Sequence, residues 1–313
     1  MNQALNAVKN EIKQVLRGKD SVIDLVLCAL LAKGHILLED IPGVGKTTLA
    51  VALSRSLSLD YKRMQFTPDV LPSDILGFQM YDKNSGEFHF VKGAIFCNLF
   101  LADEINRTSP KTQSALLEVM EERRVTVEGE SAALPDPFFV IATQNPFGAS
   151  GTQKLPDSQL DRFFVRLSLG YPDTASAVEI LMGKSSDQMN LVQPVLTTDE
   201  LLDMQRQTED VFVDDSLYRY IVELVESTRR TDYLAQGISP RGSLAVLKMA
   251  KAHAFYDDRD FLIPDDILSV FYSVTNHRLL LSTRAKAEGL GGYDVVDRLI
   301  RQLPIPKLST PRG

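Results

Sequence analysis

Short apolar runs alternate with helical patterns in the first half of the chain. Residues 36–39 (ILLE), 98–102 (NLFLA) and 138–143 (FFVIAT) are almost entirely apolar. Continuous runs of this kind are typical of strands that are buried on both faces of a parallel sheet. Residues 46–57 follow the first run with helical spacing, so strand and helix alternate. The pattern predicts an α/β fold with a parallel sheet flanked by helices.

The pattern changes after about Tyr171, where only helical signals remain. Thr197 and Glu200 have the spacing of a capping box, and Ser239 followed by Pro240 is typical of a helix start. We therefore expect two domains. An α/β core occupies residues 1–172, and an all-helical domain occupies residues 173–313.

Composition indicates a folded protein of a reducing compartment. The 313 residues are 44% hydrophobic and 24% charged, which is ordinary for a globular chain. Cys28 and Cys97 both lie in apolar runs, so we expect two buried, reduced thiols. The N-terminus has charges throughout, and no segment approaches the roughly 18 apolar residues of a membrane span. We expect a cytoplasmic protein without direct membrane insertion.

The formal net charge of −7 bears on the class of partner. A nucleic-acid motor usually carries a basic face. Here the basic pairs at 123–124 and 229–230 each lie near acidic residues in the sequence. We therefore expect no nucleic-acid partner.

A glycine-containing loop joins the first strand to the first helix. Residues 40–48 read DIPGVGKTT, in the strand–loop–helix context that a phosphate-binding loop requires. Gly43 and Gly45 would let backbone N–H groups approach the phosphates of ATP, and Lys46 would neutralise β- and γ-phosphate charge. Thr47 would offer its hydroxyl to Mg²⁺, and the helix would direct its positive end at the anion.

The loop departs from the full pattern at one position. The pattern begins with glycine five positions before Gly45, and this chain has Asp40 there. Val44 and Thr48 complete the predicted binding segment. On the loop alone, a glycine turn that merely connects strand and helix is an alternative interpretation.

Two adjacent acids follow the second apolar run. Asp103 and Glu104 would lie at the carboxyl edge of the sheet, where α/β folds bind ligands. Asp103 would hold Mg²⁺, and Glu104 would orient and deprotonate the attacking water. The alternative is a solvated helix start.

Three further polar residues extend the candidate site. Asn145 follows the third run, so its amide would reach both the γ-phosphate and the attacking water. Arg162 ends the segment LPDSQLDR, from which a cation could reach a neighbouring subunit's γ-phosphate. Arg241 lies in the first turn of a helix, where the helix dipole disfavours a cation unless an anion binds there. The alternatives are a plain Asn-Pro turn, a surface ion pair and a solvated arginine.

Together these segments resemble the MoxR family of AAA+ ATPases. The match runs in order from residue 17 to about residue 280, through ILLEDIPGVGKTTLA, QFTPDVLPSDILGF, KGAIFCNLFLADEINRTSPKTQSALLEVMEE, VTVEGE, FFVIATQNP, GTQKLPDSQLDRF and ISPRGSLAVLKMAKAHA. The resemblance implies an AAA+ core and a helical lid domain. It also implies two hairpin inserts, over residues 77–93 and 123–135, that project toward the axis of a ring.

The resemblance assigns a role to each candidate residue. The Walker A positions correspond to Gly43, Gly45, Lys46 and Thr47, and the Walker B positions correspond to Asp103 and Glu104. Asn145 corresponds to sensor 1, Arg162 to the arginine finger and Arg241 to sensor 2. Because the lid is repositioned in this clade, Arg241 could act on its own nucleotide or on a neighbour's.

The resemblance implies an ATP- and Mg²⁺-dependent, chaperone-like motor. Such motors form hexameric rings and remodel or activate partner proteins, often ones with a von Willebrand factor A domain. Three alternatives remain: a helicase- or restriction-type nucleic-acid motor, a magnesium-chelatase-like motor subunit, and a nucleotide-gated scaffold that does not hydrolyse ATP. The hairpin inserts lack the basic character that strand tracking requires, and the full set of catalytic positions argues against a scaffold.

Overall fold

The computed structural model describes residues 2–145, 155–182 and 188–307, and it is built around a five-stranded sheet. Every pairing in this sheet is parallel, and the strand order is β2-β5-β8-β1-β9. The strands are β1 (Ile36–Glu39), β2 (Tyr61–Gln65), β5 (Leu99–Asp103), β8 (Phe139–Gln144) and β9 (Val165–Leu167).

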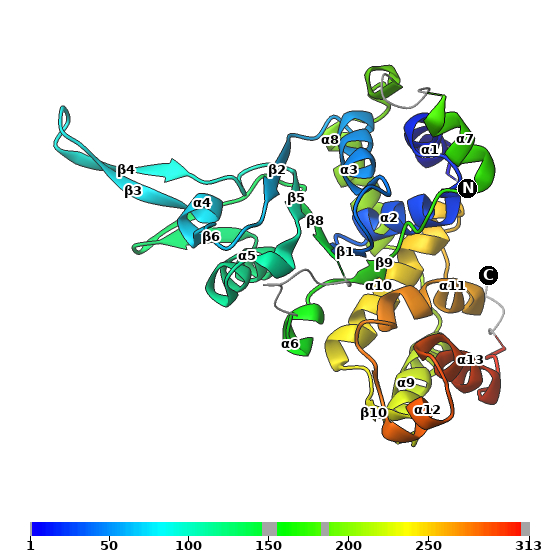
Figure 1. Cartoon of the computed structure of the whole chain (residues 1–313). Coiled ribbons are helices and arrows are strands. Elements are labelled where there is room, and N and C mark those ends of the chain that lie inside the picture. The colour runs from blue at the N-terminus through cyan, green and yellow to red at the C-terminus, as the bar shows by residue number, and fades with distance from the viewer. Residues whose placement is uncertain (1, 146–154, 183–187, 308–313) are drawn as a thin grey trace.

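The central strands are buried on both faces. In β1, Ile36 and Leu38 belong to one hydrophobic cluster, and Leu37 belongs to another on the opposite face. Helices cover both faces, as Figure 1 shows, so the predicted α/β architecture is confirmed. The helices of the core are α1 (Gln3–Val15), α2 (Asp20–Leu31), α3 (Lys46–Ser56), α4 (Pro72–Leu76), α5 (Pro110–Glu122) and α6 (Asp157–Leu160).

The sequence predicted the central strands and missed the edges. β1 has the predicted bounds, whereas β5 and β8 each begin and end one residue later than expected. The edge strand β2 has no fully buried residue, so its sequence YKRMQ lacks an apolar run. β9 has only three residues, too few for a recognisable pattern.

Two hairpins extend from the core, and one projects far from the rest of the molecule (Figure 1). β3 (Gly77–Asp82) pairs with β4 (Glu87–Lys92), and β6 (Arg124–Val127) pairs with β7 (Glu130–Ala133). Both hairpins fall within the predicted inserts. A hydrogen bond of 2.9 Å from Gln79 Nε2 to Glu130 Oε2 joins the first hairpin to the second.

The rest of the chain is mainly helical. Its helices are α7 (Thr174–Leu181), α8 (Thr198–Glu209), α9 (Asp215–Arg230), α10 (Pro240–Tyr256), α11 (Pro264–Thr275), α12 (Thr283–Ala287) and α13 (Gly292–Gln302), with a 3₁₀ turn η2 (Gln188–Leu191). Another 3₁₀ turn, η1 (Ile105–Arg107), lies in the core between β5 and α5. The predicted caps of α8 at Thr197 and of α10 at Ser239 are present. A short antiparallel pair, β10 (Leu234–Gln236) with β11 (Leu280–Leu281), was not predicted.

The helical region packs directly against the core. α11 contacts the edge strand β9, and α10 contacts α2. The boundary between residues 172 and 173 stays a prediction. In the described ranges, no helix is both long enough and apolar enough to cross a membrane.

Burial keeps the two cysteine thiols and the imidazole of His35 neutral. Cys28 and Cys97 are buried and free, as expected, and burial raises the pKa of the Cys97 thiol to about 12. His35 lies just before β1, where Val140 N donates to its Nδ1 at 3.0 Å. Its Nε2 therefore carries the proton and donates to Met120 O at 2.9 Å. Burial lowers the pKa of His35 to about 4.

Acid should destabilise the protein through His35. The unfolded chain binds a proton near pH 6.5 that the folded chain binds only near pH 4, so the free energy of unfolding falls as pH drops through this window. The share of His35 between pH 7 and pH 5 is about 2 kcal/mol. His35→Gln should therefore lose less stability over this interval than the wild type, measured by urea unfolding.

Leu134→Ala, which removes a buried side chain that has no titratable group, provides the control for this experiment. This variant should follow the wild-type pH dependence. Equal losses for His35→Gln and the wild type would show that His35 titrates alike in both states. Some dependence should remain in His35→Gln, because burial also lowers the pKa of His277.

Candidate functional site

The loop between β1 and α3 has the backbone of a phosphate-binding loop. Gly43 and Gly45 have φ values of 85° and 101°, in the left-handed region that other residues rarely adopt. α3 begins at Lys46, directly after Gly45. The N–H groups at the start of α3 therefore face the space enclosed by the loop, together with the positive end of the helix dipole.

Lys46 supplies the cation of this loop. Its side chain is folded back so that Nζ donates to the carbonyl oxygen of Asp40 at 2.7 Å. The residue is only 9% exposed, and burial lowers its pKa, an effect that nearby carboxylates of Asp40, Asp103 and Glu104 oppose. The charge is thus held in place before any ligand arrives.

The structure explains why aspartate can replace the first glycine of the pattern. The carboxylate of Asp40 accepts hydrogen bonds from Ser168 Oγ at 3.1 Å, from Gly170 N at 3.2 Å and from Leu169 N. All three donors belong to the segment that follows β9. Asp40 therefore anchors the base of the loop to that segment.

Both oxygens of the Asp103 carboxylate have partners. Oδ1 accepts from Thr143 Oγ1 at 2.6 Å, and Oδ2 accepts from Arg63 Nη2 at 2.7 Å. These residues come from the strands on either side of β5, because β2 carries Arg63 and β8 carries Thr143. The Asp103 carboxylate is thus held in position by the two strands that flank β5.

Glu104 has an unusual backbone conformation. It is a non-glycine residue with a φ of 57°, and its N–H donates to Thr143 Oγ1 at 2.8 Å. Its side chain accepts from Arg107 Nη1 at 2.8 Å. Other non-glycine residues such as Lys33 and Arg123 also adopt this conformation, so at Glu104 it serves to define the direction of the backbone after β5.

The loop and the acids enclose one cavity of about 360 Å³. Its lining consists of Pro42, Gly43, Gly45, Lys46, Thr47, Thr48, Arg63, Gln65, Asp103 and Glu104. Val44, also predicted to bind, packs instead against the hydrophobic core. The hydroxyl of Thr47 and the carboxylate of Asp103 share this cavity, so the oxygen donors present fit Mg²⁺.

Asn145 follows the last residue of β8, the strand between β1 and β5. It is therefore at the carboxyl edge of the sheet, as expected from the sequence. Its backbone oxygen accepts a hydrogen bond from Asn106 Nδ2 at 3.3 Å. The described lining of the cavity does not include it. Pro146 and residues 151–154 of the predicted motifs lie outside the described residues.

Sequence reasoning missed three residues of this site: Arg63, Gln65 and Thr143. Arg63 and Gln65 are alternate residues of the edge strand β2, and no local motif marks them. Thr143 was the last residue of a predicted strand and has no exposed surface. Its role depends on the pairing of β8 with β5, and this pairing is not visible in sequence spacing.

Arg162 and Arg241 lie together in a second cavity, of about 450 Å³. Its lining consists of Lys33, His35, Met120, Glu121, Arg123, Arg162, Phe164, Glu209, Arg241 and Lys248. The two cavities share none of these residues. The structure thus unites the two predicted arginines with each other and separates them from the phosphate loop.

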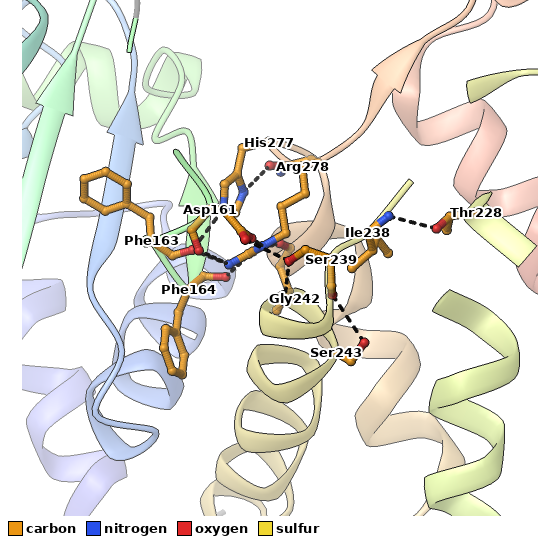
Figure 2. A network of polar contacts seen from close by, with 12 residues as sticks. Asp161, Phe163, Phe164, Thr228, Ile238, Ser239, Gly242, Ser243, His277 and Arg278 are labelled. Carbon is orange, nitrogen blue, oxygen red and sulfur yellow. Dashed lines mark hydrogen bonds and ion pairs between the residues drawn. The ribbon is translucent and has the colours of Figure 1, made fainter. Parts of the chain in front are cut away.

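A partly buried polar network involves residues close in the chain to these two arginines, and Figure 2 shows it. Asp161 Oδ2 accepts from Ser239 Oγ at 2.7 Å, and Oδ1 accepts from Arg278 Nε at 2.6 Å. Arg278 also donates to the carbonyl oxygens of Phe163 and Phe164. The network joins the segment before β9 to the start of α10 and to the segment that follows α11.

Comparison with known families identifies two regions. Residues 35–165 match the family described as "ATPase family associated with various cellular activities (AAA)". Residues 226–299 match the AAA lid domain.

Full-length relatives give a consistent result. The chain is 45% identical to the uncharacterised protein YeaC of Bacillus subtilis, over 98% of this chain and 96% of that protein. It is 38% identical to Chaperone MoxR1 of Mycobacterium tuberculosis, over 96% of this chain and 81% of that protein. A crystal structure from Cytophaga hutchinsonii, named as a candidate ATPase, superposes with a TM-score of 0.89 at 37% identity, over 97% of this chain and 95% of that one.

Lys46→Ala should weaken ATP binding by at least roughly 10- to 150-fold, because each charged hydrogen bond contributes about 1.5–3 kcal/mol. A fluorescent ATP analogue titrated at constant salt would measure the affinity. Lys83→Ala, at the exposed tip of the first hairpin, is the control and should bind normally. Unchanged affinity in Lys46→Ala would mean that the loop is only a turn.

Proposed function

The chain belongs to the MoxR family of AAA+ ATPases, and we propose that it binds ATP with Mg²⁺ and hydrolyses it at a site shared between neighbouring subunits. Hydrolysis would drive the chaperone-like remodelling or activation of partner proteins. The observation that carries the proposal is the convergence of Lys46, Thr47, Asp103 and Glu104 on one cavity at the carboxyl edge of the sheet.

The residues of this cavity would have separate roles in ATP hydrolysis. Lys46 and the N–H groups of the loop bind the phosphates, and their charge is preorganised before ATP arrives. Thr47 and Asp103 would hold Mg²⁺, which supplies positive charge to the phosphate oxygens. Glu104 accepts the proton of the attacking water, and Asn145 orients that water. The hydrogen bond from Glu104 N to Thr143 Oγ1 supports this role, because it fixes the backbone from which the Glu104 side chain extends.

The two cationic side chains of the second cavity would act on the nucleotide of a neighbouring subunit. Support comes from their separation: Arg162 and Arg241 line a cavity that contains no residue of the phosphate loop. A cation that cannot reach its own nucleotide can stabilise transition-state charge only when a second subunit docks. We extend the proposal to a closed ring, which in this family is hexameric.

The first hairpin supports a protein client over a nucleic acid. Residues 77–93 carry two aspartate or glutamate residues and two lysines, so the hairpin offers no excess of basic charge to phosphates. It does expose apolar side chains: Phe88 is 67% exposed, with Phe78, Met80 and Tyr81 nearby in the same ribbon. Exposed apolar side chains of this kind suit protein contacts. A partner with a von Willebrand factor A domain belongs to the same proposal and rests on family membership alone.

Glu104→Gln should separate binding from chemistry. The variant keeps the shape of the side chain and loses the base, so ATP affinity should stay near wild type. Turnover should fall by roughly two orders of magnitude or more. Phosphate release measures turnover, and Glu118→Gln on the exposed face of α5 is the control. Parallel loss of binding and turnover would assign Glu104 a structural role instead.

Arg162→Ala should bind ATP normally and hydrolyse it poorly. The deficit for an arginine finger is roughly three to five orders of magnitude. Mixing Arg162→Ala with Lys46→Ala should restore some turnover, because an intact loop then meets an intact arginine at some interfaces. Wild-type turnover per subunit should also rise with protein concentration. Full activity of dilute monomers, or no recovery in mixed oligomers, would disprove action between subunits.

A further inference from the structure

We propose that Glu121 is a positioning residue that holds Arg162 of the core and Arg241 of the helical domain as one pair of cations, presented to the nucleotide of the neighbouring subunit. The inference rests on the proposed function, because it needs both arginines to act between subunits. It adds a residue that touches no nucleotide and acts through the two that do.

Glu121 contacts the charged ends of both arginines. Its Oε2 lies 3.5 Å from Arg162 Nε, and its Oε1 accepts a hydrogen bond from Arg241 Nη2. Glu121 belongs to the last turn of α5, Arg162 lies just before β9, and Arg241 lies in the first turn of α10. One carboxylate therefore joins two cations that are 79 residues apart in the chain.

The backbone attachment points of the two arginines are also held together. Asp161 is the residue before Arg162, and Ser239 is the N-cap of the helix that carries Arg241. The side chains of Asp161 and Ser239 are hydrogen-bonded to each other, and Arg278 closes the same network (Figure 2). The backbone positions of Arg162 and Arg241 are thus fixed relative to each other, and only the two arginine side chains remain to be ordered.

Ordering these side chains has a cost that Glu121 reduces in advance. A free arginine side chain has many rotamers, and two such side chains would lose this entropy when they bind phosphate. Arg162 approaches Glu121 most closely through Nε, and the guanidinium carries further N–H donors that can bind an anion. The two guanidinium groups and one carboxylate keep a net positive charge.

Glu121 and the two arginines form a triad that is accessible to a docking subunit. The side chains of Arg162, Arg241 and Glu121 are 30%, 41% and 41% exposed. Lys248 and Arg123 line the same cavity, which adds positive charge around the triad. An approaching triphosphate would therefore meet an attractive field and two cations that are already convergent.

Glu121→Gln tests the proposal, with Glu122→Gln as the matched control. Glu122 is the next residue on α5, is exposed, and makes no ion pair in the described part of the chain. Glu121→Gln should keep its own ATP affinity and KM, and its kcat in the assembled state should fall by roughly 10- to 100-fold, the range for misplaced catalytic groups. Glu122→Gln should match the wild type.

Mixing assigns the defect to one side of the interface. Glu121→Gln combined with Lys46→Ala should recover turnover, because the intact loop of the first meets the intact triad of the second. Glu121→Gln combined with Arg162→Ala should recover none, because every interface then has a damaged triad. A general folding defect in Glu121→Gln would abolish the recovery with Lys46→Ala, and this result would overturn the proposal.

The remaining outcomes separate the two claims. If Arg162→Ala turns over normally, the shared site itself is wrong. If Arg162→Ala is impaired and Glu121→Gln matches Glu122→Gln, only the role of Glu121 is wrong. Faster turnover in Glu121→Gln would mean that the carboxylate competes with phosphate for the arginines, which also overturns the positioning role.

Discussion

The buried guanidinium of Arg278 determines how the two parts of the chain meet. Its side chain is 3% exposed, and it donates to Asp161 and to the carbonyl oxygens of Phe163 and Phe164. A buried charge is tolerated only when it is paired and hydrogen-bonded, and removing one partner of such a pair costs about 3–5 kcal/mol. The segment before β9 and the segment that follows α11 are therefore held in one relative position. The cavity that contains Arg162 and Arg241 depends on this joint.

The sequence predicted those residues of the site whose position follows from the strand or helix next to them in the chain. The phosphate loop follows β1 and precedes α3, so Lys46 and Thr47 had to lie at that edge of the sheet. Asp103 and Glu104 follow a strand buried on both faces, and this burial is visible as an unbroken apolar run. The roles given to these four residues, and to Asn145, Arg162 and Arg241, all stay predictions. The structure places the last three beside the ends or beginnings of the expected elements.

The parts that sequence missed depend on contacts between distant segments. Arg63 reaches Asp103 only because β2 pairs with β5, and Thr143 reaches it only because β8 pairs on the other side. The departure at Asp40 looked like a defect of the motif, whereas its partners lie about 130 residues further along the chain. Glu121 occurs in a run of acids at the end of α5, and spacing alone cannot single out the one that meets two arginines.

The projecting hairpin has a consequence for the newly made chain. A two-stranded ribbon has unpaired N–H and C=O groups along both outer edges, and β3 and β4 add exposed aromatic side chains such as Phe88. Such edges promote pairing with other chains and aggregation, and natural proteins counter this with charges on the ribbon. Asp82, Lys83, Glu87 and Lys92 are placed on it at the tip and the base. These four charges would act as gatekeepers that hinder the pairing of this ribbon with other newly made chains.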